Sequence, residues 1–199
     1  MDRVDCIQVY EIADKLRNPS VYIEFLGFGR DPDDLLANPS RSAEAPHAFA
    51  QSMTMVFEGL GKKIEQLTTK HEVSKARGDI QYPGGVIRAG TVGGQHWEWT
   101  AWSDGVPLMV YHFYYLMGDA LEPDWDCGDS RYRVVMEGNP SFEMTLAGRK
   151  ESDGRHPFLG IDWTALLGAT AIPQVCDARP GVVTHLDLGV VQPRGLVRR

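Results

Sequence analysis

Residues 86–117 read VIRAGTVGGQHWEWTAWSDGVPLMVYHFYYLM, and this stretch decides the fold. Side chains on either side of Asp104-Gly105 follow a period of two, and an Asp-Gly pair between two such runs is typical of a tight β-hairpin. The first arm reads as one long strand over 86–103 or as two shorter strands broken at Gly93-Gly94. The second arm returns over 106–117. The stretch therefore predicts a long antiparallel hairpin.

Three further stretches show strand patterns. Apolar residues are dense and partly alternating over residues 3–12, and residues 66–76 are polar but tolerated in strands. Residues 131–147 read as a second, half-solvated hairpin that turns near Gly138-Asn139-Pro140. The tail over 182–191 could add one short strand.

Two main helices are expected. From Phe49 to Ile64, apolar residues fall at steps of three and four, which is one face of a helix, and Pro46 suits its first turn. A last helix is expected over about 163–176, with Asp162 as its cap and Pro173 kinking or restarting it.

A short helix over 19–27 precedes a long loop of about 29–45, rich in proline and aspartate, which reads as a functional lid or a mobile excursion. With that loop, residues 1–199 are expected to form a single domain. The fold class is α+β: a largely antiparallel or mixed β-sheet of five to seven strands with two main helices packed on one face and no Rossmann domain.

Charge and composition exclude several classes. The 199 residues carry 20 Lys+Arg against 27 Asp+Glu, a net charge of −7, which argues against nucleic acid or an anionic membrane as partner. No run of apolar residues is long enough to span a membrane. The N-terminus lacks the apolar core of a signal peptide, so we expect a cytoplasmic protein.

The three cysteines, Cys6, Cys127 and Cys176, form no CxxC pair, which fits a reducing compartment. Neither Cys127 nor Cys176 has a histidine partner visible in the sequence. We therefore expect small buried hydrophobic side chains rather than nucleophiles.

Nucleotide and hydrolase motifs are absent. Gly27-Phe-Gly29 continues into Arg30 without the third glycine of a dinucleotide fingerprint, and it follows a helix rather than a strand. The sequence holds no phosphate-binding P-loop and no GxSxG motif. No cofactor-binding residue is therefore assigned.

Metal ligands are not predicted either. His96 and Glu98 share one face of a strand, as do His112 and Tyr114, so a mixed site across the hairpin is geometrically possible. An isolated strand histidine is more often a hydrogen-bonded structural residue. The acidic run 122–129 lacks the offsets of a calcium loop and reads as a solvated connector.

Aromatic residues crowd the hairpin. Trp97 and Trp99 share one face and Trp102 the other, and the tyrosines of the return strand divide likewise. One face must pack under the helices, which leaves the other as an exposed aromatic patch. We favour a subunit interface over a pocket for that patch.

Five stretches occur in an order that resembles a known family: IQVYEIAD (7–14), FLGFG (25–29), GTVGGQHWEW (90–99), EPDW (122–125) and AIPQVCDARPG (171–181). They resemble the C-terminal domain of the dihydrodipicolinate-reductase-like group, which includes 2,4-diaminopentanoate dehydrogenase and the native amine dehydrogenases. Members have an N-terminal Rossmann domain that binds NAD(P) and a C-terminal α+β domain that closes over the substrate and forms the dimer. This sequence resembles only the second.

The resemblance implies a set of substrate-binding residues but no catalytic one. The segment beside the substrate cleft, residues 25–29, and the helix end over 172–176 would shape an apolar chamber for a ketone, imine or amine. The implied substrate-binding residues are Phe25, Gly27, Phe28, Gly29, Trp99, Ile172 and Cys176.

Three functional hypotheses follow. The first is the substrate-binding and dimerisation domain of an NAD(P)-dependent oxidoreductase acting on amines, imines or carbonyl compounds. NAD(P) is not expected to bind this chain alone, and the expected partners are a small-molecule substrate, a second copy through the sheet and a separate Rossmann domain. The alternative is a stand-alone, non-catalytic ligand-binding or interaction module that kept the fold. A cleft sealed by Phe25, Phe28 or the 29–45 segment favours the alternative, and an open groove favours the first. The third, an independent hydrolase or lyase using His96, His112 or the acidic loop over 122–129, is the least supported.

Overall fold

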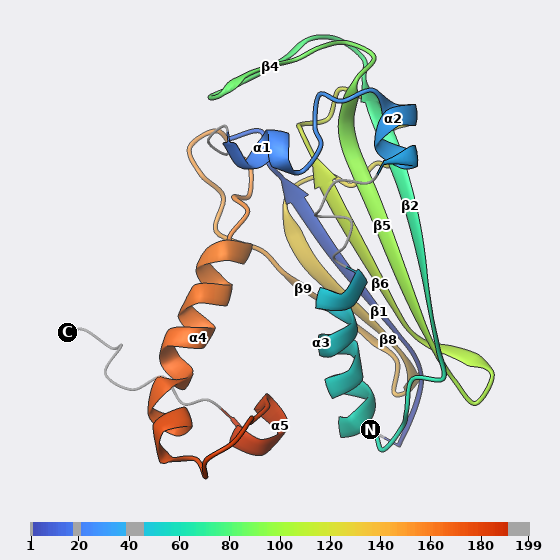
Figure 1. The fold of residues 1–199 in the computed structure, drawn as a ribbon, viewed down its shortest axis with the longest axis vertical. Coiled ribbons are helices and arrows are strands. Elements are labelled where there is room, and N and C mark those ends of the chain that lie inside the picture. The colour runs from blue at the N-terminus through green and yellow to red at the C-terminus, as the bar shows by residue number, and fades with distance from the viewer. Residues whose placement is uncertain (1, 18–20, 39–45, 191–199) are drawn as a thin grey trace.

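A seven-stranded sheet forms the centre of the structure, a computed structural model that describes residues 2–17, 21–38 and 46–190 (Figure 1). The strand order is β7-β2-β5-β6-β1-β8-β9, in which β1 and β6 are parallel and every other neighbouring pair is antiparallel. The strands are β1 (Arg3–Asp14), β2 (Gln66–Ala76), β5 (Val92–Ser103), β6 (Val106–Leu116), β7 (Leu121–Glu122), β8 (Arg131–Asn139) and β9 (Phe142–Leu146). Strands β3 (Ile80–Tyr82) and β4 (Gly85–Ile87) form a small second sheet. The predicted α+β class with a largely antiparallel sheet is confirmed.

The predicted hairpin is present as β5 and β6. Asp104 and Gly105 have φ of 52° and 75°, as a tight two-residue turn requires. The break in the first arm falls at residues 88–91, however, and Gly93-Gly94 lie inside β5. A Cβ at Gly93 would lie 2.7 Å from the side chain of Leu121. The glycine is therefore needed for close packing rather than for ending a strand.

One face of the sheet packs under helix α3 (Pro46–Gly59), which crosses in front of the strands in Figure 1. Met53 and Phe57 are fully buried against Trp99, which is 1% exposed. Side chains of this size each contribute about 2–3 kcal/mol when buried. The main core of the protein therefore lies between α3 and strands β5 and β6, and we call this face the helix side.

Helix α4 (Gly160–Asp177) also lies on the helix side, beside α3 (Figure 1). The ring of Trp163 lies 5.6 Å from that of Tyr132, which the strand register places on the same face as Phe113. The prediction of two main helices on one face is confirmed. Several apolar side chains of α4 remain exposed, namely Ile161, Leu166, Leu167, Ile172 and Val175.

The ends of the last helix differ from the prediction. It begins at Gly160, so that Asp162 lies in its first turn rather than at its cap, and it runs on through Pro173 without a restart. Pro173 has no backbone N–H to donate to the carbonyl of Ala169. Because Ala169 is exposed, water can bond this carbonyl instead, and the helix continues. Beyond it the tail forms helix α5 (His185–Leu188) instead of a strand, because Thr184 and the side chain of residue 187 close a capping box.

The region expected to be a long loop contains helix α2 (Pro32–Ala37). Asp31 caps it by accepting hydrogen bonds from the backbone N–H groups of Asp33 and Asp34, and Pro32 occupies its first position. Residues 39–45 of that predicted loop lie outside the described residues. The short helix predicted over 19–27 is α1 (Val21–Phe25); its first two predicted residues also lie outside them.

The exposed aromatic patch predicted on the hairpin is not found there. Trp97, Trp99, Tyr111 and Phe113 all pack on the helix side, in the core with α3. The opposite face of the hairpin carries His96, Glu98, His112 and Tyr114. The aromatic crowding therefore reflects core packing, which period-two alternation alone could not separate from an interface. No helix within the described ranges is both long and apolar enough to cross a membrane.

Candidate functional site

A buried carboxylate on the helix side of β1 is held by two tyrosines from other strands. The hydroxyl of Tyr111 on β6 donates to Glu11 Oε2 at 2.7 Å, and the hydroxyl of Tyr132 on β8 donates to Glu11 Oε1 at 2.9 Å. The register brings them together, since Glu11 pairs with Phe113 on one side and with Tyr132 on the other. Glu11 is 8% exposed. We call Glu11, Tyr111, Tyr132 and the neighbouring Lys15 the Glu11 cluster.

Lys15, just beyond the end of β1, is the most unusual member. Its side chain is 1% exposed. Its ammonium lies 3.6 Å from the ring centroid of Phe158 and 4.7 Å from that of Tyr115. Aromatic faces stabilise a cation but replace only part of its hydration. A lysine held this way costs the fold free energy, which points to a functional role.

Burial sets the proton affinities of the cluster. It raises the pKa of Glu11, while the two tyrosine hydrogen bonds and the charge of Lys15 lower it. Burial lowers the pKa of Lys15 to about 8, against the opposing effect of the Glu11 charge. Burial and the nearby carboxylate raise the pKa of Tyr111 and Tyr132. The amine of Lys15 thus titrates close to neutral pH, in the range where a lysine can accept or donate a proton.

An apolar groove opens beside the cluster, between the β8–β9 hairpin and α4. Its volume is about 360 Å³, and it is lined by Tyr132, Val134, Met144, Leu146, Gly160, Trp163, Thr164 and Leu167. The first turn of α4 packs closely against Tyr132 because residue 160 is glycine. A Cβ at this position would lie 2.6 Å from the hydroxyl of Tyr132 and would clash with the ring of Phe158. Tyr132 belongs to both the groove and the Glu11 cluster. A small molecule with an apolar body could therefore place one polar group near the carboxylate.

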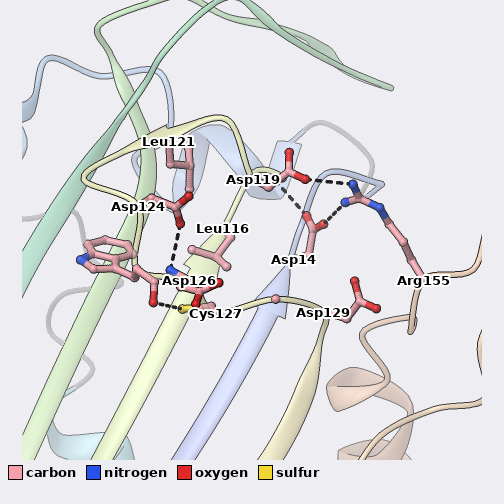
Figure 2. A pocket seen from close by; sticks show the side chains of 12 residues that line it. Asp14, Leu116, Asp119, Leu121, Asp124, Asp126, Cys127, Asp129 and Arg155 are labelled. Carbon is pink, nitrogen blue, oxygen red and sulfur yellow. Dashed lines mark hydrogen bonds and ion pairs between the residues drawn. The ribbon is translucent and has the colours of Figure 1, made fainter.

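A second cavity, of about 280 Å³, lies past the ends of β1 and β6 (Figure 2). Arg155 bridges Asp14 and Asp119 at 3.5 and 3.2 Å. The remaining carboxylates of this acidic cavity come from the stretch predicted to be a solvated connector: Asp124, Asp126 and Asp129. With five carboxylates and one guanidinium in its lining, this cavity favours binding of a positively charged group. Asp14, however, already accepts the backbone N–H groups of Leu16 and Gly118, and Asp124 accepts that of Asp126.

Of the cysteines, Cys176 is exposed on α4 rather than buried as expected. Cys127 is half-buried in the wall of the acidic cavity, and burial raises its pKa to about 12. A thiol with so high a pKa is a poor nucleophile at neutral pH.

The residues implied by the resemblance lie in three places. Phe28 is buried in a core beneath α1 and α2, and Gly29 donates its N–H to the carbonyl of Val92. Trp99 is buried under α3, while Ile172 is exposed on α4. Phe25 is exposed at the end of α1, Gly27 turns the chain there with φ of 91°, and Cys176 lies one turn after Ile172. The structure does not gather all seven in one cavity, and whether they contact a substrate stays a prediction.

Across the described ranges, one group of side chains is close enough to share a metal ion: His96, Glu98 and His112, on the face of the sheet opposite α3. A dinucleotide fits the described residues poorly. The Gly29 N–H is already bonded, and the N-terminus of α2 is closed by the carboxylate of Asp31, which would repel a phosphate.

The sequence model of a family described as the 2,4-diaminopentanoate dehydrogenase C-terminal domain matches residues 3–197. The chain belongs to this family. The resemblance drawn from the five stretches is thereby confirmed. Among curated proteins, an amine dehydrogenase from Streptomyces virginiae is 26% identical over 200 residues, covering 94% of this chain and 53% of that protein.

The family fold is also found in a solved structure. The amine dehydrogenase from Mycobacterium smegmatis superposes with a TM-score of 0.67 at 16% identity, over 96% of this chain and 53% of that one. The chain therefore spans about half the length of these two relatives.

Sequence reasoning missed the Glu11 cluster, the apolar groove and the acidic cavity. One signal was present for the first of these: Glu11 is a single charged residue inside the apolar run from Val9 to Ala13. A carboxylate in such a run must be paired or functional. Its partners, 100 and 121 residues away, have no signal in the local sequence.

Proposed function

We propose that this chain is the substrate-binding and dimerisation part of an NAD(P)-dependent oxidoreductase acting on an amine, imine or carbonyl compound. The observation that carries the proposal is the apolar groove lined by Tyr132, whose hydroxyl donates a hydrogen bond to the buried Glu11 carboxylate. Such an arrangement binds the carbon skeleton of a substrate by burial and orients its single polar group. Membership of the family and the names of the two amine dehydrogenases support this choice of substrate class.

Each part of the groove has a proposed task. Leu146 and Leu167 bind the apolar body and keep water away from the reacting carbon. The hydroxyl of Tyr132 contacts the nitrogen or oxygen of the substrate, and Glu11 holds that hydroxyl in place. Lys15 adjusts the charge of the carboxylate through its own protonation. No step is assigned to the nicotinamide, because these residues form no cradle for it.

The cofactor is proposed to come from a part of the enzyme outside these 199 residues. The exposed apolar side chains of α4, such as Ile161 and Leu166, provide a surface on which that part could dock. The stand-alone module is less well supported. Among the residues that the structure describes, the groove lining includes neither Phe25 nor Phe28 nor any residue of the 29–45 segment, so nothing that this alternative needs seals the groove.

Cyclohexylamine and cyclohexanone are suitable probes of the groove. Titration of the chain should give saturable shifts of the Trp163 indole signal in ¹H–¹⁵N spectra. Leu167→Arg, which fills the groove with a cation, should weaken cyclohexylamine binding at least about tenfold, equivalent to roughly 1.4 kcal/mol. The matched control is Leu166→Arg, a neighbour that is also exposed but does not line the groove. NADPH fluorescence should not respond to the chain alone. Equal affinity in the two variants would remove the groove from the proposal, and saturable NADPH binding would contradict the placement of the cofactor.

Dimerisation is proposed to use the face of the sheet opposite α3 and α4. This face carries ion pairs such as that of Arg133 with Glu143, at 2.7 and 2.8 Å. Val110 on β6 lies near the centre of the face. Sedimentation velocity of the chain should show a dimer. Val110→Lys should yield monomers because it places a cation in the interface, whereas Val106→Lys at the exposed end of the same strand should not. A monomeric unsubstituted chain would end this part of the proposal.

A further inference from the structure

Three potential metal ligands converge on the face of the sheet opposite α3. His96 and Glu98 project from β5, and His112 projects from β6 directly across from Glu98. The side chains of His96 and His112 are 8% and 14% exposed, and that of Glu98 is 32% exposed. The three side chains thus form a shallow site with its open side at the carboxylate.

The distances match those of ligands around one small ion. His96 Nε2 lies 3.3 Å from His112 Nδ1, and His112 Nδ1 lies 3.7 Å from Glu98 Oε2. Two ligands of a tetrahedral zinc ion with bonds of about 2.05 Å are roughly 3.3 Å apart. All three donor atoms lie within 4.8 Å of one another. Small side-chain rotations would therefore bring them to a common centre.

A carboxylate behind His96 sets its tautomer. Glu72, opposite His96 on β2, places Oε2 3.1 Å from His96 Nδ1. A proton on Nδ1 leaves the lone pair of Nε2 directed at His112. Zinc-binding histidines are commonly oriented by such a carboxylate, which fixes the ring and raises the basicity of the ligand nitrogen. The aromatic rings of Tyr10 and Tyr114 stack on His112 and His96 and hold both imidazoles in place.

We propose that His96, Glu98 and His112 bind a divalent transition-metal ion of the zinc type. Two imidazole nitrogens and one carboxylate oxygen form a donor set that suits Zn²⁺ and Co²⁺ better than Mg²⁺ or Ca²⁺, which select oxygen. Three protein ligands leave a fourth position, which water fills in a single chain and which would face the second copy in the proposed dimer. The site joins β5 to β6, and it stands independently of the proposed amine chemistry.

Cobalt titration of the full chain tests the site. Co²⁺ should produce the visible absorption of a tetrahedral ion at a stoichiometry of one per chain, and Zn²⁺ should displace it. His112→Phe keeps a ring stacked on Tyr10 but removes a ligand. Glu98→Gln removes the anionic ligand, and its side chain is about one-third exposed. Both substitutions should abolish the signal. Glu72→Gln should retain the site with roughly tenfold weaker binding, as loss of an outer-sphere partner predicts.

His71→Phe is the matched control. His71 stacks on Trp97 at 3.5 Å on the helix side of the same sheet and takes no part in the cluster. Its variant should bind cobalt like the unsubstituted chain. Melting curves in metal-free buffer identify any variant that fails to fold. Glu98→Gln should retain the fold, because it keeps the shape of a partly exposed side chain. No cobalt binding by the unsubstituted chain, or unchanged binding by folded Glu98→Gln, would overturn the proposal.

Discussion

Replacing Lys15 with methionine is expected to raise the free energy of unfolding at pH 7 by about 2–3 kcal/mol. Burial lowers the pKa of this lysine to about 8 from its ordinary value of about 10.5. A difference of about 2.5 pKa units corresponds to roughly 3.4 kcal/mol between the two protonation states, and the loss of a cation near Glu11 offsets part of it. Methionine fills nearly the same volume without carrying a charge into the core.

The pH dependence distinguishes this explanation from better packing. Between about pH 8 and 10.5 the unfolded chain keeps the proton on Lys15 and the folded chain has lost it, so stability rises with pH over that range. In Lys15→Met this contribution should disappear. Urea unfolding at pH 7, 8, 9 and 10 measures both effects. Lys70→Met, at an exposed side chain, should match the unsubstituted protein within about 0.5 kcal/mol. A Lys15→Met protein with unchanged stability at pH 7 and an unchanged slope would show that the lysine is not buried as a cation.

A stabilising substitution at Lys15 would also bear on function. Residues that cost a protein stability are retained where activity needs them, and such residues concentrate at active sites. Lys15 acts on the charge of Glu11, and Glu11 accepts a hydrogen bond from Tyr132, which lines the apolar groove. The cost of the lysine thus supports a role for the Glu11 cluster in chemistry rather than in packing.

Local patterns predicted the elements that depend on neighbours in the sequence. The β5–β6 hairpin follows from Asp104-Gly105 between alternating runs, and α3 follows from its apolar spacing. The prediction failed where a residue distant in the sequence decides the local structure. The sequence allows a strand break at Gly93, but this glycine lies inside β5 and leaves room for the side chain of Leu121. Only the strand order reveals that contact.

The Glu11 cluster marks the limit of sequence reasoning. Strand order places β1 between β6 and β8, and that order brings Tyr111 and Tyr132 to the same carboxylate. A pairing register shifted by one residue would turn each tyrosine to the opposite face. The single sequence contains no record of the register, so the site could be recognised only after the sheet was known.

Replacing Glu11 with glutamine is expected to destabilise the protein by about 2–4 kcal/mol at pH 7, because it leaves the buried charge of Lys15 without a compensating anion. Glutamine keeps an oxygen acceptor for Tyr111 or Tyr132, so most of the loss is electrostatic. Because the Glu11 charge raises the pKa of Lys15, that pKa should fall further in the variant. The pH range over which stability rises should then begin below pH 8. Glu58→Gln, on the exposed side of α3, is the matched control.

The double variant tests whether the two residues act as a pair. If Glu11 chiefly compensates the charge of Lys15, then Glu11→Gln should cost at least about 1 kcal/mol less in the Lys15→Met background than in the unsubstituted chain. Urea unfolding of the four proteins measures this coupling. Purely additive effects would mean that Glu11 serves the two tyrosines alone. In that case its buried charge would need another cation, and a substrate ammonium group in the apolar groove would be the first to test by repeating the cycle with cyclohexylamine present.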